Sequence, residues 1–375
     1  MTLGILKEAN GEQRVAVTPD ALPGLLKAGF KKIMVEYGAG APAFYSDATY
    51  EKQGAVLADG DAVLQQADVL VKIQPMDSFA KLPSGKILIS QLNPLGQADL
   101  AKALVASGAT VFSLDLVPRT TRAQAMDVLS SMATAAGYKA VLTAASHLPT
   151  FFPMMMTAAG TIKPAKVLIL GAGVAGLQSI ATARRLGATV EAFDVRAAAK
   201  EEVLSLGAKF VEVEGARDDK GAGGYAVEQS ADFLQRQAQL VHDHALLADV
   251  VICTAQIPGK KAPLLLHQAT VEAMKSGAVV IDLAASSGGN CALTENNKSI
   301  RTANGVLIIG DSALPASIPK DASNMYSKNV INFLKLFFNK NAEFNLNFDD
   351  DIIAAACVAH QGNLVSERMK QSIAQ

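Results

Sequence analysis

The chain has 375 residues with a formal net charge of -1, and half of its residues are hydrophobic. A charge this close to zero provides no overall field that would attract nucleic acid or anionic lipid. The cysteines Cys253, Cys291 and Cys357 are isolated and lack a companion histidine at zinc-ligand spacing, so we expect neither a disulfide framework nor a metal site. The length predicts two domains. The isolated cysteines indicate a reducing compartment.

The first third of the chain alternates predicted strands and helices. Short β-branched or leucine-rich runs, bounded by glycine, proline or charge, predict strands at 3–6, 32–36, 69–73, 86–90 and 110–114. Apolar residues that recur every three or four positions predict helices at 20–28, 61–67 and 99–106. This alternation is typical of an α/β domain.

A second series of elements follows a predicted helix at 131–147. Its strands are expected at 167–170, 189–194, 209–213, 250–254, 278–283 and 306–309. Helices fit between these strands, which indicates a parallel, doubly wound sheet with right-handed crossovers. An amphipathic helix at 321–338 is expected to return the chain to the first domain.

No segment of the sequence has the pattern of an export signal or a membrane span. Charge appears at Lys7 and Glu8, before a signal-peptide-length apolar run develops. The most apolar window, 148–162, is broken by Pro149 and Pro153 and is shorter than the roughly 20 residues that a spanning helix needs. We therefore expect a chain that does not itself cross a membrane.

The strongest motif is a strand, a glycine turn and a helix. KVLIL at 166–170 leads into GAGVAG at 171–176, with Ala172 and Val174 between the glycines, and then into a helix-forming run. Gly171 would make the tight turn, Gly173 would let the backbone approach a pyrophosphate, and Gly176 would let helix and strand pack closely. The pattern predicts a dinucleotide-binding site at this turn.

An acidic residue at the end of the next predicted strand supports that site. Asp194 lies 18 residues after Gly176, where a carboxylate can accept hydrogen bonds from the adenosine ribose. It would repel the 2′-phosphate of NADP, which favours NAD(H), although Arg196, beyond Val195, could receive that phosphate. The alternative is a packed glycine turn beside a solvated Asp194.

A polar segment at 118–131 precedes the second domain. Four of its side chains are candidates to hold a nicotinamide ring or a phosphate: Arg119, Gln124, Asp127 and Ser130. The alternative is an ordinary helix start, with Thr120 or Thr121 as the cap and with Arg122 and Asp127 in water.

We therefore expect two Rossmann-like α/β domains with parallel sheets, of which the second is a doubly wound dinucleotide-binding domain. The first would comprise 1–128 plus 325–375 and the second 129–324, with the nicotinamide in the cleft between them.

Several motifs together resemble the NAD(H)-binding domain I of proton-translocating NAD(P) transhydrogenase over nearly the whole chain. They are RVAVTP at 14–19, the segment 119–131, FPMMMTAAG at 152–160, the glycine turn, DVR at 194–196, GGY at 223–225, IPGK at 257–260, and DLA at 282–284 with GGN at 288–290. The departures are Ser317, where many members have arginine, and Ser286, where some have glutamate.

The resemblance implies hydride exchange between NAD(H) on this chain and NADP(H) on a partner domain, coupled to proton movement through a membrane domain. It implies that these partners are separate chains, that the protein is a homodimer, and that it lies in the cytoplasm at the inner face of the membrane. Arg119, Gln124, Asp127 and Ser130 match the family's nicotinamide loop. Further matches to nucleotide-contacting positions are Gly224, Tyr225 on a closing loop, Gln237 and Gln256.

Two other functions are compatible with a dinucleotide-binding fold. The chain also resembles alanine dehydrogenase in Arg14, Lys72 and the Pro-Gly-Lys turn. That resemblance implies a catalytic histidine and aspartate where this chain has Asn93 and Ser286, and neither of these can titrate. Arg14 and Lys72, which bind a substrate carboxylate in those dehydrogenases, are expected here to be ion-pair partners. A non-enzymatic NAD(H) sensor would have little use for a nicotinamide clamp.

Overall fold

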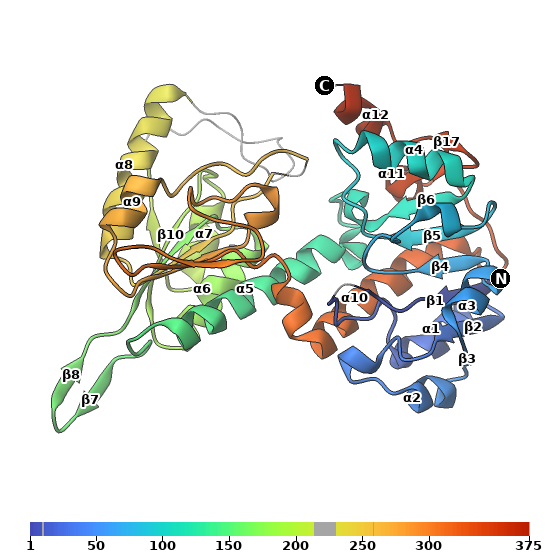
Figure 1. Ribbon diagram of the computed structural model, residues 1–375, viewed down its shortest axis with the longest axis horizontal. Helices are drawn as coiled ribbons and strands as arrows, with labels where there is room; N and C mark the ends of the chain where they lie inside the picture. Colours follow the sequence, from blue (N-terminus) through green and yellow to red (C-terminus); the bar gives the residue numbers. More distant parts are fainter. Residues whose placement is uncertain (10, 214–229, 258, 375) are drawn as a thin grey trace. The chain divides into compact units, whose positions relative to one another are not determined.

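The computed structural model describes residues 1–9, 11–213, 230–257 and 259–374 (Figure 1). The chain forms two compact units, which we call unit 1, Met1–Met132 with Ala316–Gln375, and unit 2, Ala133–Pro315. Each unit contains a mostly parallel sheet and several helices, so the predicted α/β fold class is confirmed.

Eight strands form one sheet in the described part of unit 1, in the order β17-β16-β6-β5-β4-β1-β2-β3. Their bounds are β1 Thr2–Ile5, β2 Lys32–Glu36, β3 Val56–Ala58, β4 Val69–Val71, β5 Ile87–Ser90, β6 Thr110–Ser113, β16 Cys357–His360 and β17 Asn363–Leu364. All five predicted strands are present. The sheet is parallel except at one edge, where β16 pairs antiparallel with β6 and β17 pairs antiparallel with β16.

The helices of unit 1 come from both ends of the chain. They are α1 Leu22–Ala28, α2 Asp47–Lys52, α3 Gly60–Gln66, α4 Ala98–Ser107, α10 Pro319–Leu334, α11 Asp351–Ala356 and α12 Glu367–Ala374. Short 3-10 turns include η4 Leu114–Leu116, η5 Gln124–Met126 and η8 Lys335–Phe337. The predicted helix at 321–338 is α10 followed by η8, and its Phe333 and Phe337 rings pack 5.6 and 5.3 Å from Phe112 of β6. This aromatic contact joins the C-terminal part of unit 1 to its sheet.

Unit 2 contains a seven-stranded sheet among its described residues, in the order β11-β10-β9-β12-β13-β15-β14. The bounds are β9 Lys166–Leu170, β10 Thr189–Phe193, β11 Lys209–Val211, β12 Val250–Cys253, β13 Val279–Asp282, β14 Ser299–Arg301 and β15 Leu307–Ile309. All predicted strands are present and parallel, and β14 is an additional antiparallel edge strand. The strand order reverses between β9 and β12, which is where ligands bind in doubly wound sheets.

Apolar side chains on both faces of this sheet pack against helices. The helices are α5 Val128–His147, α6 Val174–Arg185, α7 Ala199–Ser205, α8 Ala231–Leu247 and α9 Gln268–Ala273. On β9, Val167 and Ile169 belong to one buried cluster and Leu168 and Leu170 to another. Successive side chains point to opposite faces of a strand, so the continuous apolar run KVLIL is the pattern of a strand covered on both sides.

A two-stranded hairpin occupies the apolar window 148–162, for which the sequence predicted no strand. It consists of β7 Met155–Thr157 and β8 Gly160–Ile162, and all of its strand residues are exposed. Among the described helices, none combines the length and the apolar character of a membrane span.

Candidate functional site

The glycine turn lies between β9 and α6, at the point where the strand order of unit 2 reverses. Gly171 has φ 103°, a conformation that residues with a side chain rarely adopt. A Cβ atom at Gly176 would lie 1.9 Å from the carbonyl oxygen of Gly171. Both glycines are therefore required by the local backbone, as the sequence predicted.

Gly173 has a different role, because nothing among the described residues requires it to be glycine. Its φ of -74° suits any residue, and a Cβ atom there would meet no heavy atom within 4 Å. No side chain caps the N-terminus of α6 at this residue. The turn therefore leaves open backbone in front of the positive end of a helix dipole, an arrangement that suits a pyrophosphate.

Two residues that the sequence pattern did not reveal hold this turn in place. The Thr254 hydroxyl, just after β12, donates to the carbonyl of Gly171 at 2.8 Å. A Cβ atom at Gly137 of α5 would lie 2.2 Å from the carbonyl oxygen of Ala175, so α5 can approach the first turn of α6 closely only with glycine there. A glycine inside a predicted helix is the signal that could have identified Gly137.

Asp194 follows β10 and lies beside the turn. Its Oδ2 accepts a hydrogen bond from the amide of Ala172 at 2.7 Å. Arg196 donates to the same carboxylate from its backbone amide, Nε and Nη2 at 2.9, 3.0 and 2.9 Å. Asp194 therefore lies beside the glycine turn, and it is bonded to Arg196, the residue that the sequence suggested could receive a 2′-phosphate. Val195 between them packs against a buried cluster.

The remaining nucleotide-contacting candidates are dispersed. Gln237 lies on α8 and is buried, and its Oε1 has no hydrogen-bond partner among the described residues. Gln256 is exposed, and its Nε2 donates to the carbonyl of Leu283 at 2.7 Å. Gly224 and Tyr225 lie outside the described residues.

The nicotinamide candidates cluster at the start of α5, in the stretch of chain that belongs to unit 1. Asp127 accepts hydrogen bonds from the amide of Ser130 at 2.9 Å and from its hydroxyl at 2.6 Å, so it caps α5. Gln124 lies on η5 and is exposed, as is Arg119 five residues earlier.

The alternative that Thr120 or Thr121 caps this helix was therefore wrong. A cap must directly precede the first helical turn, and Asp127 is the residue at that position. Arg122 is not simply solvated either, because it forms a two-pronged ion pair with Asp350 at 2.6 and 2.9 Å and also contacts Asp351.

Arg14 and Lys72 are ion-paired, as expected. Arg14 bonds the carboxylate of Glu12 through two nitrogens at 2.7 and 2.6 Å, and Lys72 lies 3.3 Å from Glu8. Burial alone would raise the pKa of Glu12, but the hydrogen bonds and charge of Arg14 lower it further than burial raises it. At Glu8 burial outweighs Lys72, and the pKa of that carboxyl is raised. Both cations are occupied by carboxylates of the chain itself.

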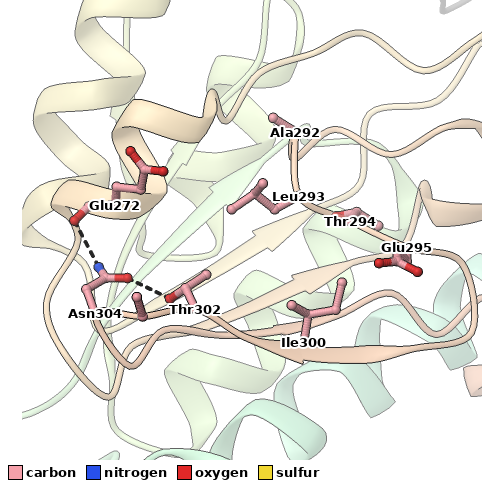
Figure 2. Close-up of a pocket in the computed structure, with 9 residues that line it drawn as sticks. Glu272, Ala292, Leu293, Thr294, Glu295, Ile300, Thr302 and Asn304 are labelled. Carbon is pink, nitrogen blue, oxygen red and sulfur yellow. Dashed lines mark hydrogen bonds between the residues drawn. The ribbon is translucent and has the colours of Figure 1, made fainter.

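Unit 2 also has a pocket of about 640 Å³ that contains none of the predicted site residues (Figure 2). Its lining residues are Glu272, Ala292, Leu293, Thr294, Glu295, Ile300, Thr302, Ala303 and Asn304. The Asn304 amide donates to the carbonyls of Val271, Glu272 and Met274 at the end of α9, and so it serves to cap that helix.

The titratable groups among the described residues do not form a metal site or a reactive thiol. No cluster of three histidine, cysteine or acidic side chains there has metal-binding geometry. Cys253, Cys291 and Cys357 are all buried, and burial raises the pKa of each thiol. A buried thiol with a raised pKa is a poor nucleophile.

Family comparisons match nearly the whole length of the chain. The model for the alanine dehydrogenase/PNT N-terminal domain matches residues 4–136, and the model for the C-terminal domain matches residues 140–367. The chain belongs to the alanine dehydrogenase/PNT family. The glycine turn and Asp194 both lie in the region of the C-terminal model.

Within this family the chain is more similar to transhydrogenases than to alanine dehydrogenases. It is 43% identical to an NAD(P) transhydrogenase subunit alpha chain of Rhodospirillum rubrum, over 97% of this chain and 98% of that protein. A solved transhydrogenase structure from Sinorhizobium meliloti shares 41% identity, covers 97% of this chain and 100% of its own, and superposes with a TM-score of 0.88. Alanine dehydrogenase of Mycobacterium tuberculosis is 28% identical over 98% of this chain and 96% of its own length. The predicted resemblance to transhydrogenase and the predicted oxidoreductase class are confirmed.

Proposed function

We propose that this family member is the NAD(H)-binding subunit of a proton-translocating transhydrogenase. It would exchange a hydride with NADP(H) held by a partner domain, while a separate membrane subunit couples the exchange to proton movement. The observation that carries the proposal is the glycine turn: an open backbone at Gly173 stands before an uncapped helix N-terminus, with Asp194 alongside.

The glycine turn and the segment 119–130 have separate roles in this proposal. The turn from Gly171 to Gly176 would hold the pyrophosphate, and Asp194 the adenosine ribose, which favours NAD(H) over NADP(H). Arg119, Gln124, Asp127 and Ser130 would orient the nicotinamide. Gly224, Tyr225, Gln237 and Gln256 are proposed as further nucleotide contacts.

Bound NADH supplies the hydride, and the chain has to position the ring. Direct transfer between two nicotinamides moves no proton to or from a substrate oxygen, so the site needs no general acid or base. A polar clamp without a histidine agrees with this requirement. So does the chemistry of Asn93 and Ser286, which stand where a dehydrogenase would carry titratable groups.

We further propose a homodimer located in the cytoplasm, bound to the inner face of the membrane through its partner subunits. The Rhodospirillum rubrum relative is named as an alpha subunit, which supports an assembly with other chains. The β7–β8 hairpin supports self-association, because it exposes Met155, Met156 and Ile162. A lone two-stranded hairpin is only marginally stable, and exposed apolar patches often mark interfaces.

The test is a transfer assay with the purified chain and the NADP(H)-binding domain of a transhydrogenase. NADPH is added as the hydride donor and the acetylpyridine analogue of NAD as the acceptor. Formation of the reduced analogue is followed by absorbance. We expect rapid transfer only when both proteins are present. Failure of transfer, with NADH binding confirmed and a partner shown to be competent with another alpha subunit, would contradict the proposal. NADH formation from alanine and NAD would point to a dehydrogenase instead.

A further inference from the structure

The short turn η5, which carries Gln124, is held by a helix from far along the chain. The backbone carbonyl of Ala125 accepts hydrogen bonds from Asn329 Nδ2 at 2.9 Å and from Asn332 Nδ2 at 3.2 Å. Both asparagines lie on α10 and are three residues apart, a spacing that places them on one face of a helix. Unit 1 consists of two parts of the chain, and α10 in its second part therefore holds η5 in its first part.

Asn329 is the stronger of the two donors. Asn329 is only 6% exposed, whereas Asn332 is half-buried. The hydrogen bond from Asn329 is also the shorter of the two. Since Ala125 presents a carbonyl oxygen, only the amide nitrogen of Asn329 can face it, which fixes the orientation of that side chain. The opposite Oδ1 is buried without a partner among the described residues. The hydrogen bond to the turn is thus the polar contact that this asparagine makes.

Packing and charge fix the ends of the same turn. Ala123 and Met126, on either side of Gln124 and Ala125, are buried, while Gln124 itself is exposed. Arg122 ties the segment to Asp350 at the start of α11, and its hydrogen bond lowers the pKa of Asp350. That pair is at the surface, where solvent screens it, so it contributes less than the buried amide. Of these polar contacts, the one from Asn329 is the best shielded.

We infer that Asn329 is a positioning residue for the nicotinamide loop: it holds the backbone at Ala125 so that Gln124 projects in one orientation. The inference rests on the proposed function, since it assigns Asn329 to the same site. Asn329 does not contact the cofactor in this proposal. It limits how far the backbone that carries Gln124 can move, and small errors in ring position are costly for hydride transfer.

The test compares Asn329→Ala with Asn332→Ala as the matched control, because the latter leaves the shorter hydrogen bond intact. Trypsin can cut this segment after Arg119 and Arg122, so the rate of cleavage there, followed by mass spectrometry, reports how often the loop opens. We expect Asn329→Ala to raise that rate about tenfold, and Asn332→Ala to raise it by less than about twofold. In the two-protein transfer assay, Asn329→Ala should slow transfer by about tenfold while the Kd for NADH changes by less than about twofold.

Three outcomes would overturn the inference or separate it from the proposed function. Unchanged cleavage in Asn329→Ala would show that the asparagine does not hold the loop. Faster cleavage with unchanged transfer would show that the loop position is irrelevant to the reaction. Gln124→Asn leaves Ala125 and α10 intact, so it should slow hydride transfer without changing the rate of cleavage. If Gln124→Asn does not slow transfer, the proposed nicotinamide role of the loop is wrong. Should Asn329→Ala not fold, Asn329→Asp removes the donor while keeping the size of the side chain.

Discussion

The two glycines Gly173 and Gly176 should respond differently to alanine, although they lie in the same turn. At Gly176 the new Cβ atom would lie 1.9 Å from the Gly171 oxygen and 2.9 Å from its carbonyl carbon. Both are backbone atoms, so α6 or the turn would have to move by about 1 Å or more to reach a normal contact. Overpacking of this kind costs about 1–3 kcal/mol, which lowers the unfolding temperature of a domain of this size by roughly 2–12 °C.

Gly173→Ala should leave the fold intact and remove cofactor binding. Its Cβ atom meets no described residue within 4 Å and its φ is ordinary, so we expect the unfolding temperature to change by about 1 °C or less. The same methyl group would occupy the space through which a pyrophosphate approaches the backbone, and the Kd for NADH should rise at least about tenfold. Calorimetric unfolding and fluorescence titration with NADH measure the two effects. A folded Gly173→Ala protein that binds NADH like its parent would refute the assignment of the turn.

Two further substitutions test the charges around the site and in unit 1. Asp194→Ala removes charge-assisted acceptors for the ribose, so NADH affinity should fall by about 1.5–3 kcal/mol, and the released Arg196 should narrow the preference for NADH over NADPH. Titrations with both cofactors measure this, with Glu191→Ala on the preceding strand β10 as the control. Unchanged NADH binding would remove the ribose role. Glu12→Gln leaves the buried Arg14 unpaired and should cost about 3–5 kcal/mol at neutral pH. Because Arg14 holds the folded pKa of Glu12 below its ordinary 4.5, the parent loses this stability as pH falls through the lowered pKa, and the two proteins should converge in acid. Unfolding curves recorded from neutral to acidic pH measure the stability of the parent and of Glu12→Gln, with the exposed Asp99→Asn as the control. A stability difference between parent and Glu12→Gln that stays constant with pH would contradict this linkage.

Most of the strands that the sequence predicted have an apolar run that is buried in a sheet. All predicted strands of both units are present, because such runs leave few other ways to bury their side chains. The missed strands have weaker patterns. β3 is short and only partly buried, β7 and β8 are exposed, and β14 is a short antiparallel edge strand. β16 pairs antiparallel with β6, which comes much earlier in the chain, and β17 pairs antiparallel with β16. Their pairing is determined by tertiary contacts, which a local pattern does not contain.

The same distinction applies to the candidate site. The glycine turn and Asp194 could be located because strand, turn and carboxylate follow one another at fixed spacing. The residues that hold the glycine turn and η5 could not, because Thr254 and Asn329 act through contacts with distant backbone atoms. Their side chains are chemically ordinary, and only the fold shows which carbonyl each one meets. The sequence thus locates the groups proposed to meet the cofactor better than it locates the groups that position them.

The ion pairs of Arg14 and Lys72 explain how one fold can serve two kinds of oxidoreductase. The resemblance to alanine dehydrogenase implies that cations at these positions would bind a substrate carboxylate, whereas here Glu12 and Glu8 already pair with them. A substrate carboxylate would have to displace a buried, two-pronged partner and leave Glu12 without its counter-charge, which is strongly unfavourable. Asn93 and Ser286 further deprive such a substrate of an acid or base. At these four positions an amino acid would find neither an anchor nor a proton acceptor, whereas the glycine turn that the proposed NAD(H) site requires is present.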